Sequence, residues 1–260
     1  MKPLLTGLRG LKKSIPFQLL LFLFLTPSLA HGQMFSVKSA RKRSTTPGIA
    51  LYAGPEFLNF KYKGNVPKSE DGGLYSFNAP ILRLRAETRR FTAYLGASIG
   101  LDSLSYFDIG LRYGHGFIVY HAGKTALEIP LQLHGDLTDV TDNNLVPTAR
   151  TPHFQQAVLD LGTGIDFRTR LAPQFRLKAK VLPSYGVTFS TRQQINSGNT
   201  QNGTGTLLGF EGNARLYFDN LLGFAGLSVG YNYSFRKYNI DGELLDYNAI
   251  GNSILIGITF

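Results

Sequence analysis

The chain has 260 residues, and its 27 Lys and Arg residues outnumber its 17 Asp and Glu residues, which gives a formal net charge of +10 at pH 7. It contains no Cys, and this excludes disulfide bonds, thiol chemistry and a lipid anchor attached to cysteine. The sequence carries no phosphate-binding loop, zinc-ligand pattern or dinucleotide fingerprint. We therefore predict no cofactor and no metal.

Residues 1–33 have the three parts of a secretory signal peptide. A basic start carries Lys2, Arg9, Lys12 and Lys13. It precedes an apolar run from Phe17 to Leu25 and the small-x-small pattern Ser28-Leu29-Ala30, which predicts cleavage near residues 30–33. The apolar run is shorter than the roughly 20 residues that a membrane helix needs. We expect export through the inner membrane and removal of this leader.

Residues 34–48 form a basic tail, which includes Lys38, Arg41, Lys42 and Arg43. Such a cluster can bind nucleic acid or acidic lipid. A solvated tail before the first strand is the favoured interpretation, and we expect no nucleic-acid partner. Without the four basic residues of the leader, the formal charge of the chain falls to about +6.

From residue 49 to residue 260, apolar and polar residues alternate in ten segments. A period of two indicates β-strands with one apolar and one polar face. The segments are Ile49 to Phe60, Phe77 to Thr88, Phe91 to Leu101, Ser105 to His121, Thr125 to His134, His153 to Arg168, Phe175 to Ser190, Leu208 to Phe218, Leu221 to Arg236 and Ile254 to Phe260. Asp219-Asn220 predicts a tight hairpin turn.

The connections between these segments alternate in length. Short ones follow the even-numbered segments, at Arg89-Arg90, Ala122 to Lys124, Thr169 to Gln174 and Asp219-Asn220. Long ones follow most odd-numbered segments, at Lys61 to Ser76, Gly135 to Pro152, Thr191 to Thr204 and Lys237 to Tyr247, with Asp102 to Leu104 as the short exception. This rhythm is typical of an up-and-down outer-membrane barrel, whose periplasmic turns are short and whose outer loops are long. It predicts an all-β, antiparallel transmembrane barrel of about ten strands, with eight as the alternative.

The two faces of the segments differ in charge. The apolar face carries no Lys, Arg, Asp or Glu, as expected for side chains that face lipid, and His115 lies on it. The other face carries basic residues and a nearly equal number of acidic ones, which can pair inside a narrow barrel: Arg83, Arg85, Arg112, Arg168, Arg176, Lys178, Lys180, Arg215 and Arg236, with Glu56, Glu87, Asp108, Glu128, Asp160, Asp166 and Glu211.

Four prolines lie inside predicted strands, where each removes one donor from the hydrogen-bond ladder. They are Pro55, Pro80, Pro130 and Pro183. We expect bulges or strand ends near these positions.

The chain ends with alternating apolar residues and a terminal aromatic, Ser253-Ile254-Leu255-Ile256-Gly257-Ile258-Thr259-Phe260. With this end, residues 49–260 resemble the small bacterial outer-membrane β-barrel proteins of the porin-like and PorT-like type. The resemblance implies that the barrel-assembly machinery recognises Phe260. Members of this family are mostly non-enzymatic and differ in their roles, so the resemblance assigns no site residue to this chain.

An enzyme would need a set of reactive residues on the outer rim of the barrel. The best candidates are in and beside the long connection Gly135 to Pro152: His134, Asp136, Asp139, Asp142 and His153. Omptin-like proteases use rim Asp and His residues on ten-stranded barrels, but the sequence has no omptin motif. Asp139, Asp142, Asn143 and Asn144 could offer oxygen ligands to Ca²⁺, although their spacing is not that of a dedicated loop. We therefore predict no catalytic, cofactor-binding or metal-binding residue.

These observations favour a non-enzymatic barrel in the cell outer membrane, which contacts outer-membrane lipid and an unknown protein partner through its long loops. Ten strands leave little lumen once side chains fill it. Two alternatives remain: an omptin-like hydrolase with a rim Asp/His site, and a secreted lipocalin-like carrier whose apolar face turns inward around an apolar ligand.

Overall fold

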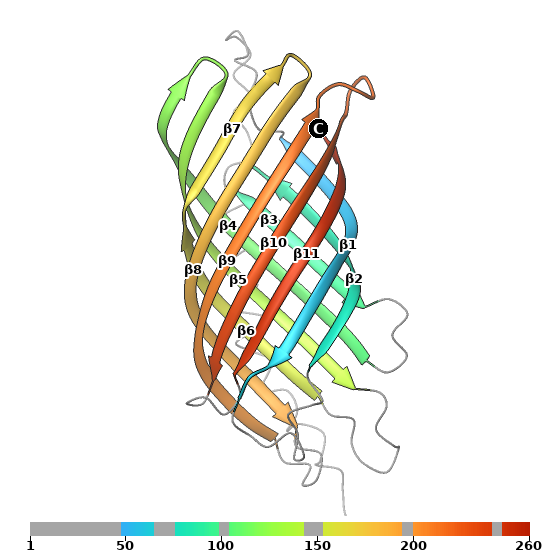
Figure 1. The fold of residues 1–260 in the computed structure, drawn as a ribbon, viewed down its shortest axis with the longest axis vertical. Coiled ribbons are helices and arrows are strands. Elements are labelled where there is room, and N and C mark those ends of the chain that lie inside the picture. Colours follow the sequence, from blue (N-terminus) through green and yellow to red (C-terminus); the bar gives the residue numbers. More distant parts are fainter. Residues whose placement is uncertain (1–47, 65–75, 99–103, 143–152, 194–199, 241–245) are drawn as a thin grey trace, which may run out of the picture. The chain divides into compact units, whose positions relative to one another are not determined.

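The computed structural model describes residues 48–64, 76–98, 104–142, 153–193, 200–240 and 246–260. The predicted signal peptide and all but the last residue of the basic tail lie outside these ranges. The described strands form one antiparallel barrel (Figure 1). They are β1 (Ile49–Tyr62), β2 (Phe77–Thr88), β3 (Phe91–Ser98), β4 (Leu104–Ala122), β5 (Thr125–Asp142), β6 (His153–Thr163), β7 (Ile165–Ala172), β8 (Phe175–Gln193), β9 (Thr200–Phe218), β10 (Gly226–Ile240) and β11 (Tyr247–Thr259).

Strands β6 and β7 are two halves of one barrel strand. Both pair with β5 on one side and with β8 on the other. Gly164 interrupts them, at a point where a Cβ would overlap the backbone carbonyl of Val181. The described residues therefore occupy ten strand positions, which confirms ten rather than eight.

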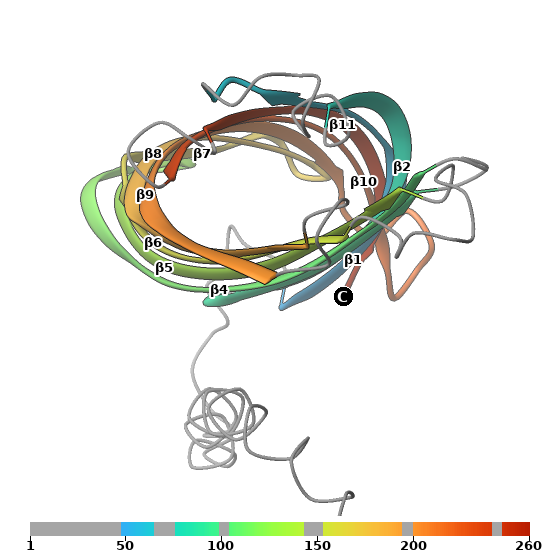
Figure 2. The same cartoon turned by 90° about the horizontal axis from the view of Figure 1, so that it is seen from below.

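The barrel closes where the last strand pairs with the first. Strand β11 lies antiparallel to β1, from Ala50 opposite Thr259 to Tyr62 opposite Tyr247. At the end of the chain the Phe260 amide donates to the Ile49 carbonyl at 2.8 Å. Figure 2 shows the resulting ring of strands. Closure satisfies the backbone groups that an open sheet edge would expose, as a barrel in lipid requires.

The apolar face of the strands points outward, as predicted. Large apolar side chains of this face are 40% to 62% exposed, for example at Leu51, Ile109, Leu131, Leu161, Val187, Phe210 and Ile256. The charged face points into the lumen, where the side chains of Glu56, Asp108, Arg112, Asp160 and Arg215 are buried. This arrangement is the reverse of a lipocalin-type carrier, which would have its apolar face inside. No helix long and apolar enough to cross a membrane occurs in the described ranges.

The strands extend further into the predicted long connections than the alternation indicated. Strand β5 runs to Asp142 instead of ending at His134, and β9 begins at Thr200. Strand β10 continues to Ile240. The added strand ends contain polar residues such as Thr138 and Asn239, which pair with neighbouring strands. Because these stretches are polar, their sequence resembles that of a loop. The remaining parts of these connections, and the predicted short connection Asp102 to Leu104 up to residue 103, lie outside the described residues.

The turn between β9 and β10 differs from the prediction. Residues 219–225 form the connection, and β10 begins at Gly226, so Asp219-Asn220 is not a two-residue hairpin turn. Asn220 and Gly223 adopt positive φ values of 59° and 77°. The Leu222 amide donates to the Ala225 carbonyl at 2.9 Å, which closes the loop.

The four strand prolines are accommodated with little disturbance. Pro80, Pro130 and Pro183 keep direct partners on neighbouring strands, at Phe57, Gly116 and Phe210. Pairing with β11 skips Gly54 and Pro55, so the expected irregularity occurs at that proline. The register shifts of the described strands lie elsewhere, at Ile118/Tyr120 in β4 and at Arg170/Ala172 in β7.

The two ends of the barrel are distinguished by their connections. We call the end with the turns β2–β3, β4–β5, β7–β8 and β9–β10 the short-turn end, and it also holds Phe260 (Figure 1). We call the opposite end the long-connection end.

Candidate functional site in the barrel lumen

An apolar layer fills the lumen near the long-connection end. We call it the aromatic layer: Leu58, Phe60, Tyr62, Ile81, Tyr106, Val140, Phe154, Val158, Leu207, Tyr238, Ile240, Tyr247 and Ala249, with Phe77 packed against it. The ring of Tyr247 lies 5.0 Å from the rings of both Phe60 and Phe154, and Phe60 stacks on Phe77 at 5.6 Å. Rings at these distances make favourable aromatic pairs in addition to burying apolar area.

Next to the aromatic layer, Arg83 bridges two carboxylates. Its Nε donates to Glu56 at 2.5 Å, and its Nη1 donates to Asp108 at 2.7 Å. A Cβ at Gly96 would overlap both the Arg83 guanidinium and the Asp108 carboxylate, so the absence of a side chain on β3 gives this pair its space. All three charged groups are buried, and a buried charge is tolerated when it is paired and hydrogen-bonded.

A second buried network connects Tyr94, His134 and Asp160. The Tyr94 hydroxyl lies 2.7 Å from His134 Nε2, and His134 Nδ1 lies 2.7 Å from Asp160 Oδ2. Tyr94 also donates to Asp136, which pairs with Arg236 at 3.2 Å. Both ring nitrogens of His134 are therefore occupied by protein groups. Sequence reasoning did not single out Tyr94, although the alternation of β3 places it on the inner face with Thr92 and Gly96.

The candidate rim residues of the sequence do not gather as one cluster among the described side chains. His134 and Asp136 lie on β5, only 3% and 4% exposed inside the lumen, and not in a loop. Asp139 belongs to the opposite face of the same strand, where it accepts from Gln155 at 3.1 Å. Asp142 is the last residue of β5 and His153 is the first residue of β6. Asn143 and Asn144 lie outside the described residues. In the described part of the chain no three His, Asp or Glu residues gather as a metal site.

An ion-pair layer occupies the lumen toward the short-turn end. Glu211 accepts from Arg112 at 2.6 Å and also faces Arg85 and Lys180, each at 3.6 Å. Glu87 pairs with Arg85 and Arg215, each at 2.5 Å. We define the ion-pair layer by these residues together with Glu128, Asp166, Arg168 and Lys178, which pair with one another at 2.9 to 3.6 Å.

Arg215 is the most deeply buried charge of the ion-pair layer. It is 2% exposed, and its guanidinium lies 4.2 Å from the centre of the Tyr52 ring. Such a position over an aromatic face adds a cation–π attraction to the ion pair with Glu87. The sequence predicted that Arg215 and Glu87 face inward, but not that these side chains, from β9 and β2, meet across the lumen.

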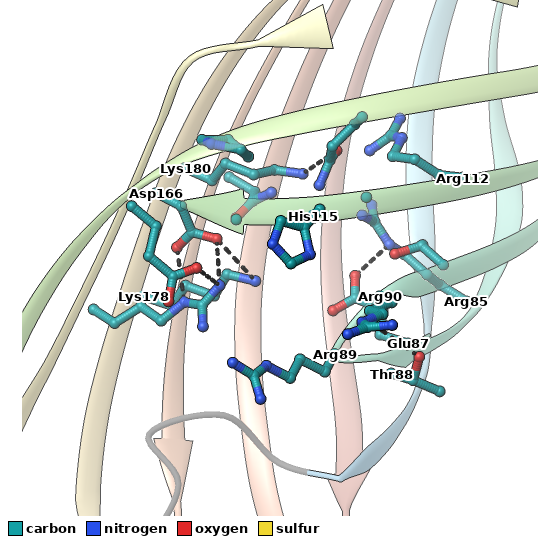
Figure 3. A pocket seen from close by; sticks show the side chains of 18 residues that line it. Arg85, Glu87, Thr88, Arg89, Arg90, Arg112, His115, Asp166, Lys178 and Lys180 are labelled. Atoms are coloured by element: carbon teal, nitrogen blue, oxygen red, sulfur yellow. Dashed lines mark hydrogen bonds and ion pairs between the residues drawn. The ribbon is translucent and has the colours of Figure 1, made fainter. Parts of the chain in front are cut away.

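Described residues line two small cavities inside the barrel. One of about 110 Å³ lies in the ion-pair layer and reaches the β2–β3 turn, where it is lined by Arg89 and Arg90 (Figure 3). The other, of about 80 Å³, lies between the Arg83 and Tyr94 networks and the aromatic layer. Spaces of this size hold a few waters or one small ion.

Comparison with known proteins shows the fold. No protein-family model and no curated protein sequence matches the chain. The outer membrane protease OmpT from Escherichia coli superposes with a TM-score of 0.56 at 9% identity, over 82% of this chain and 96% of that one. The translocator domain of the autotransporter NalP from Neisseria meningitidis gives a TM-score of 0.37 at 10% identity, over 95% and 97% of the two chains. Neisserial surface protein A gives 0.34 at 11% identity, over 82% and 97%. The likeness to OmpT and the closed sheet show that the chain has the fold of an outer-membrane β-barrel protein.

Proposed function

We propose that this chain is a non-enzymatic, integral barrel of the bacterial outer membrane, of the small porin-like and PorT-like kind. Its outward apolar belt contacts lipid, its short-turn end faces the periplasm, and its long-connection end faces outward. The many exposed large apolar side chains on the outward face of the strands support the lipid contact. The leader predicted at residues 1–33 supports the export route.

The observation that carries the proposal is the filled lumen. The aromatic layer blocks one part of the inner space, and the ion-pair layer crosses the other with buried pairs such as Arg112–Glu211. A pore for solutes needs a continuous water path, and side chains of a ten-stranded barrel fill most of the interior. We infer that the protein works through its outer surface instead of conducting solutes.

Conductance in planar lipid bilayers tests the closed lumen. We expect no stable open-channel steps from the wild-type barrel. The double variant Phe60→Ala, Phe154→Ala removes two contacting rings of the aromatic layer and should conduct more often, while Phe210→Ala, on the outward face, serves as the control. Large, regular steps from the wild-type protein would refute the closed lumen.

The proposed contacts with a protein partner lie at the long-connection end. Replacing residues 65–75, 143–152, 194–199 and 241–245 by short Gly-Ser linkers should leave a folded barrel and abolish surface crosslinks formed by the wild-type protein in intact cells. Crosslinks that persist unchanged in this variant would place the partner elsewhere.

Assembly through the C-terminus is a separate part of the proposal. The Phe260 backbone joins β11 to β1, and its ring is 52% exposed. We expect a boiled-versus-unboiled shift in gel migration for the mature chain from an outer-membrane fraction. Loss of this shift on deletion of Phe260 would support recognition by the barrel-assembly machinery, and an unchanged shift would refute it.

A hydrolase is the second candidate, because the structure with a TM-score above 0.5 is that of a protease and because His134 contacts Asp160. The burial of His134 favours a structural role, since the neighbouring 80 Å³ cavity is lined by Tyr94 and Arg236 but not by His134. A general base must reach the proton of its substrate. Cleavage of a fluorogenic peptide library by the wild-type protein, lost in His134→Ala, would overturn our proposal.

A further inference from the structure

The larger cavity of the lumen is strongly basic. Its lining contains seven cationic side chains, from Arg85, Arg89, Arg90, Arg112, Arg168, Lys178 and Lys180, but only three acidic ones, from Glu87, Glu128 and Asp166. Figure 3 shows Asp166 and Lys178 on one side of this space and Arg89 and Arg90 on the other. Even when Glu211 is counted with the acids, the positive charge around the cavity is larger than the negative charge.

The acidic residues of the lining are already paired, mostly with cations of the same lining. Asp166 contacts Arg168 at 2.9 Å and Lys178 at 3.6 Å, and Arg168 also holds Glu128 at 3.0 Å. Glu87 is shared between Arg85 and Arg215, which lies outside the lining. No described residue forms an ion pair with Arg89 or Arg90, so the surplus charge is concentrated at the mouth of the cavity.

Arg112, which lines both cavities, carries donors without acceptors. Arg112 is 6% exposed, and its Nη2 pairs with Glu211 at 2.6 Å. Its Nε and Nη1 have no hydrogen-bond acceptor among the described residues. Buried N–H groups are almost always satisfied in folded proteins. An arginine with one edge paired and the rest open is suited to bind a further oxyanion, because the guanidinium fork fits two oxygens at once.

The size of the space limits what can bind. A cavity of about 110 Å³ holds a group of a few heavy atoms but no sugar chain, peptide or acyl chain. Its entrance lies at an exposed turn, so a small solute reaches it from the short-turn end without passing the aromatic layer.

We propose that this cavity is a binding site for a small tetrahedral oxyanion, phosphate or sulfate, with Arg112 at its inner wall and Arg89 and Arg90 at its mouth. The site is independent of any partner at the long-connection end. Such an anion would neutralise the surplus charge of the ion-pair layer and supply acceptors to Arg112.

Isothermal titration of the refolded full barrel in zwitterionic detergent tests this site. Inorganic phosphate, sulfate and chloride are each titrated at matched ionic strength, because surface electrostatics depends on salt. The double variant Arg89→Gln, Arg90→Gln removes the mouth of the site from an exposed turn. The matched control is Lys124→Gln, which removes an exposed cation from the β4–β5 turn outside the cavity lining.

We expect saturable binding of phosphate or sulfate and none of chloride. The double variant should bind about tenfold more weakly, and Lys124→Gln within about twofold of wild type. The relative affinities of phosphate and sulfate then identify the preferred ion. Absence of saturable binding by both ions, equal binding of chloride, or an unchanged affinity in the double variant would each overturn the proposal. A retained heat-modifiable shift shows that each variant is folded.

Discussion

The two parts of the lumen are filled by different interactions. In the aromatic layer, rings from β1, β6 and β11 meet at 5.0 to 6.1 Å and bury their surfaces against one another. In the ion-pair layer, long side chains from β2, β4, β8 and β9 meet as alternating charges. The first interaction is non-directional and proportional to buried area, whereas the second requires a partner for each charged group.

This difference explains where space remains. Apolar side chains pack against one another without needing a specific partner, and their volume fills the lumen at this level. Charged side chains are held at fixed geometries by their partners, and the larger cavity lies among them. In the function that we propose, the aromatic layer seals the barrel, and the larger cavity lies in the ion-pair layer.

The largest expected effect comes from breaking the Arg83 bridge between Glu56 and Asp108, next to the aromatic layer. Arg83→Leu removes the shared partner of Glu56 and Asp108 and leaves two buried carboxylates uncompensated. We expect a loss of about 3 to 5 kcal/mol of unfolding free energy, measured by urea titration in lipid vesicles. The triple variant with Glu56→Gln and Asp108→Asn should recover most of this loss. Equal stability of Arg83→Leu and wild type would mean that this network is not needed.

Creating a cavity in the aromatic layer should lower the unfolding free energy by nearly as much. Phe154 is fully buried and contacts the rings of Phe60 and Tyr247. We expect Phe154→Ala to lower the unfolding free energy by about 3 to 5 kcal/mol in the same titration. Phe154→Leu, which keeps most of the volume, should cost less than half as much. Similar losses for the two variants would argue against packing as the cause.

An Arg substitution on the outward face tests whether charged side chains are tolerated only in the lumen. Ile256 is 62% exposed on the belt, and Ile256→Arg should cost about 2 to 4 kcal/mol if the position lies near the middle of the membrane. Leu227→Arg on the neighbouring strand should act in the same direction. The measurement is the amount of heat-modifiable protein in the outer membrane. Normal assembly of both Arg variants would contradict the assignment of this face to lipid.

The smallest effect is expected at Asp139, which lies outside both layers. Its contact with Gln155 is exposed, so Asp139→Ala should change the unfolding free energy by less than about 0.5 kcal/mol and leave assembly intact. A large loss would show that the long-connection end of β5 contributes to stability in the way the lumen does.

The alternation of residues predicted the faces of the strands because it follows directly from strand geometry. Leu127, Ile129 and Leu131 point outward and Glu128 inward, as their period of two requires. Pairing of the last strand with the first also agrees with the predicted up-and-down barrel. These features depend on local periodicity and on the need to satisfy every backbone group in lipid.

The candidate site was less predictable because it depends on contacts across the lumen. Glu87 and Arg215 are 128 residues apart in the chain, and no local pattern pairs them. The aromatic layer could have been noticed, since Leu58 and Ile81 are apolar residues at inward positions of otherwise polar faces. The β9–β10 turn was mistaken for strand because Leu221, Gly223 and Ala225 continue the alternation.

The pairing of β11 with β1 also gives the fold a built-in test of completeness. Any chain that stops before residue 247 lacks the strand that joins β10 to β1, so two edges stay unpaired. The defect is all-or-none, because a ring with one strand missing cannot close without changing its register. An open sheet edge alone therefore distinguishes an unfinished chain from a finished one, whatever the side chains of the other strands are.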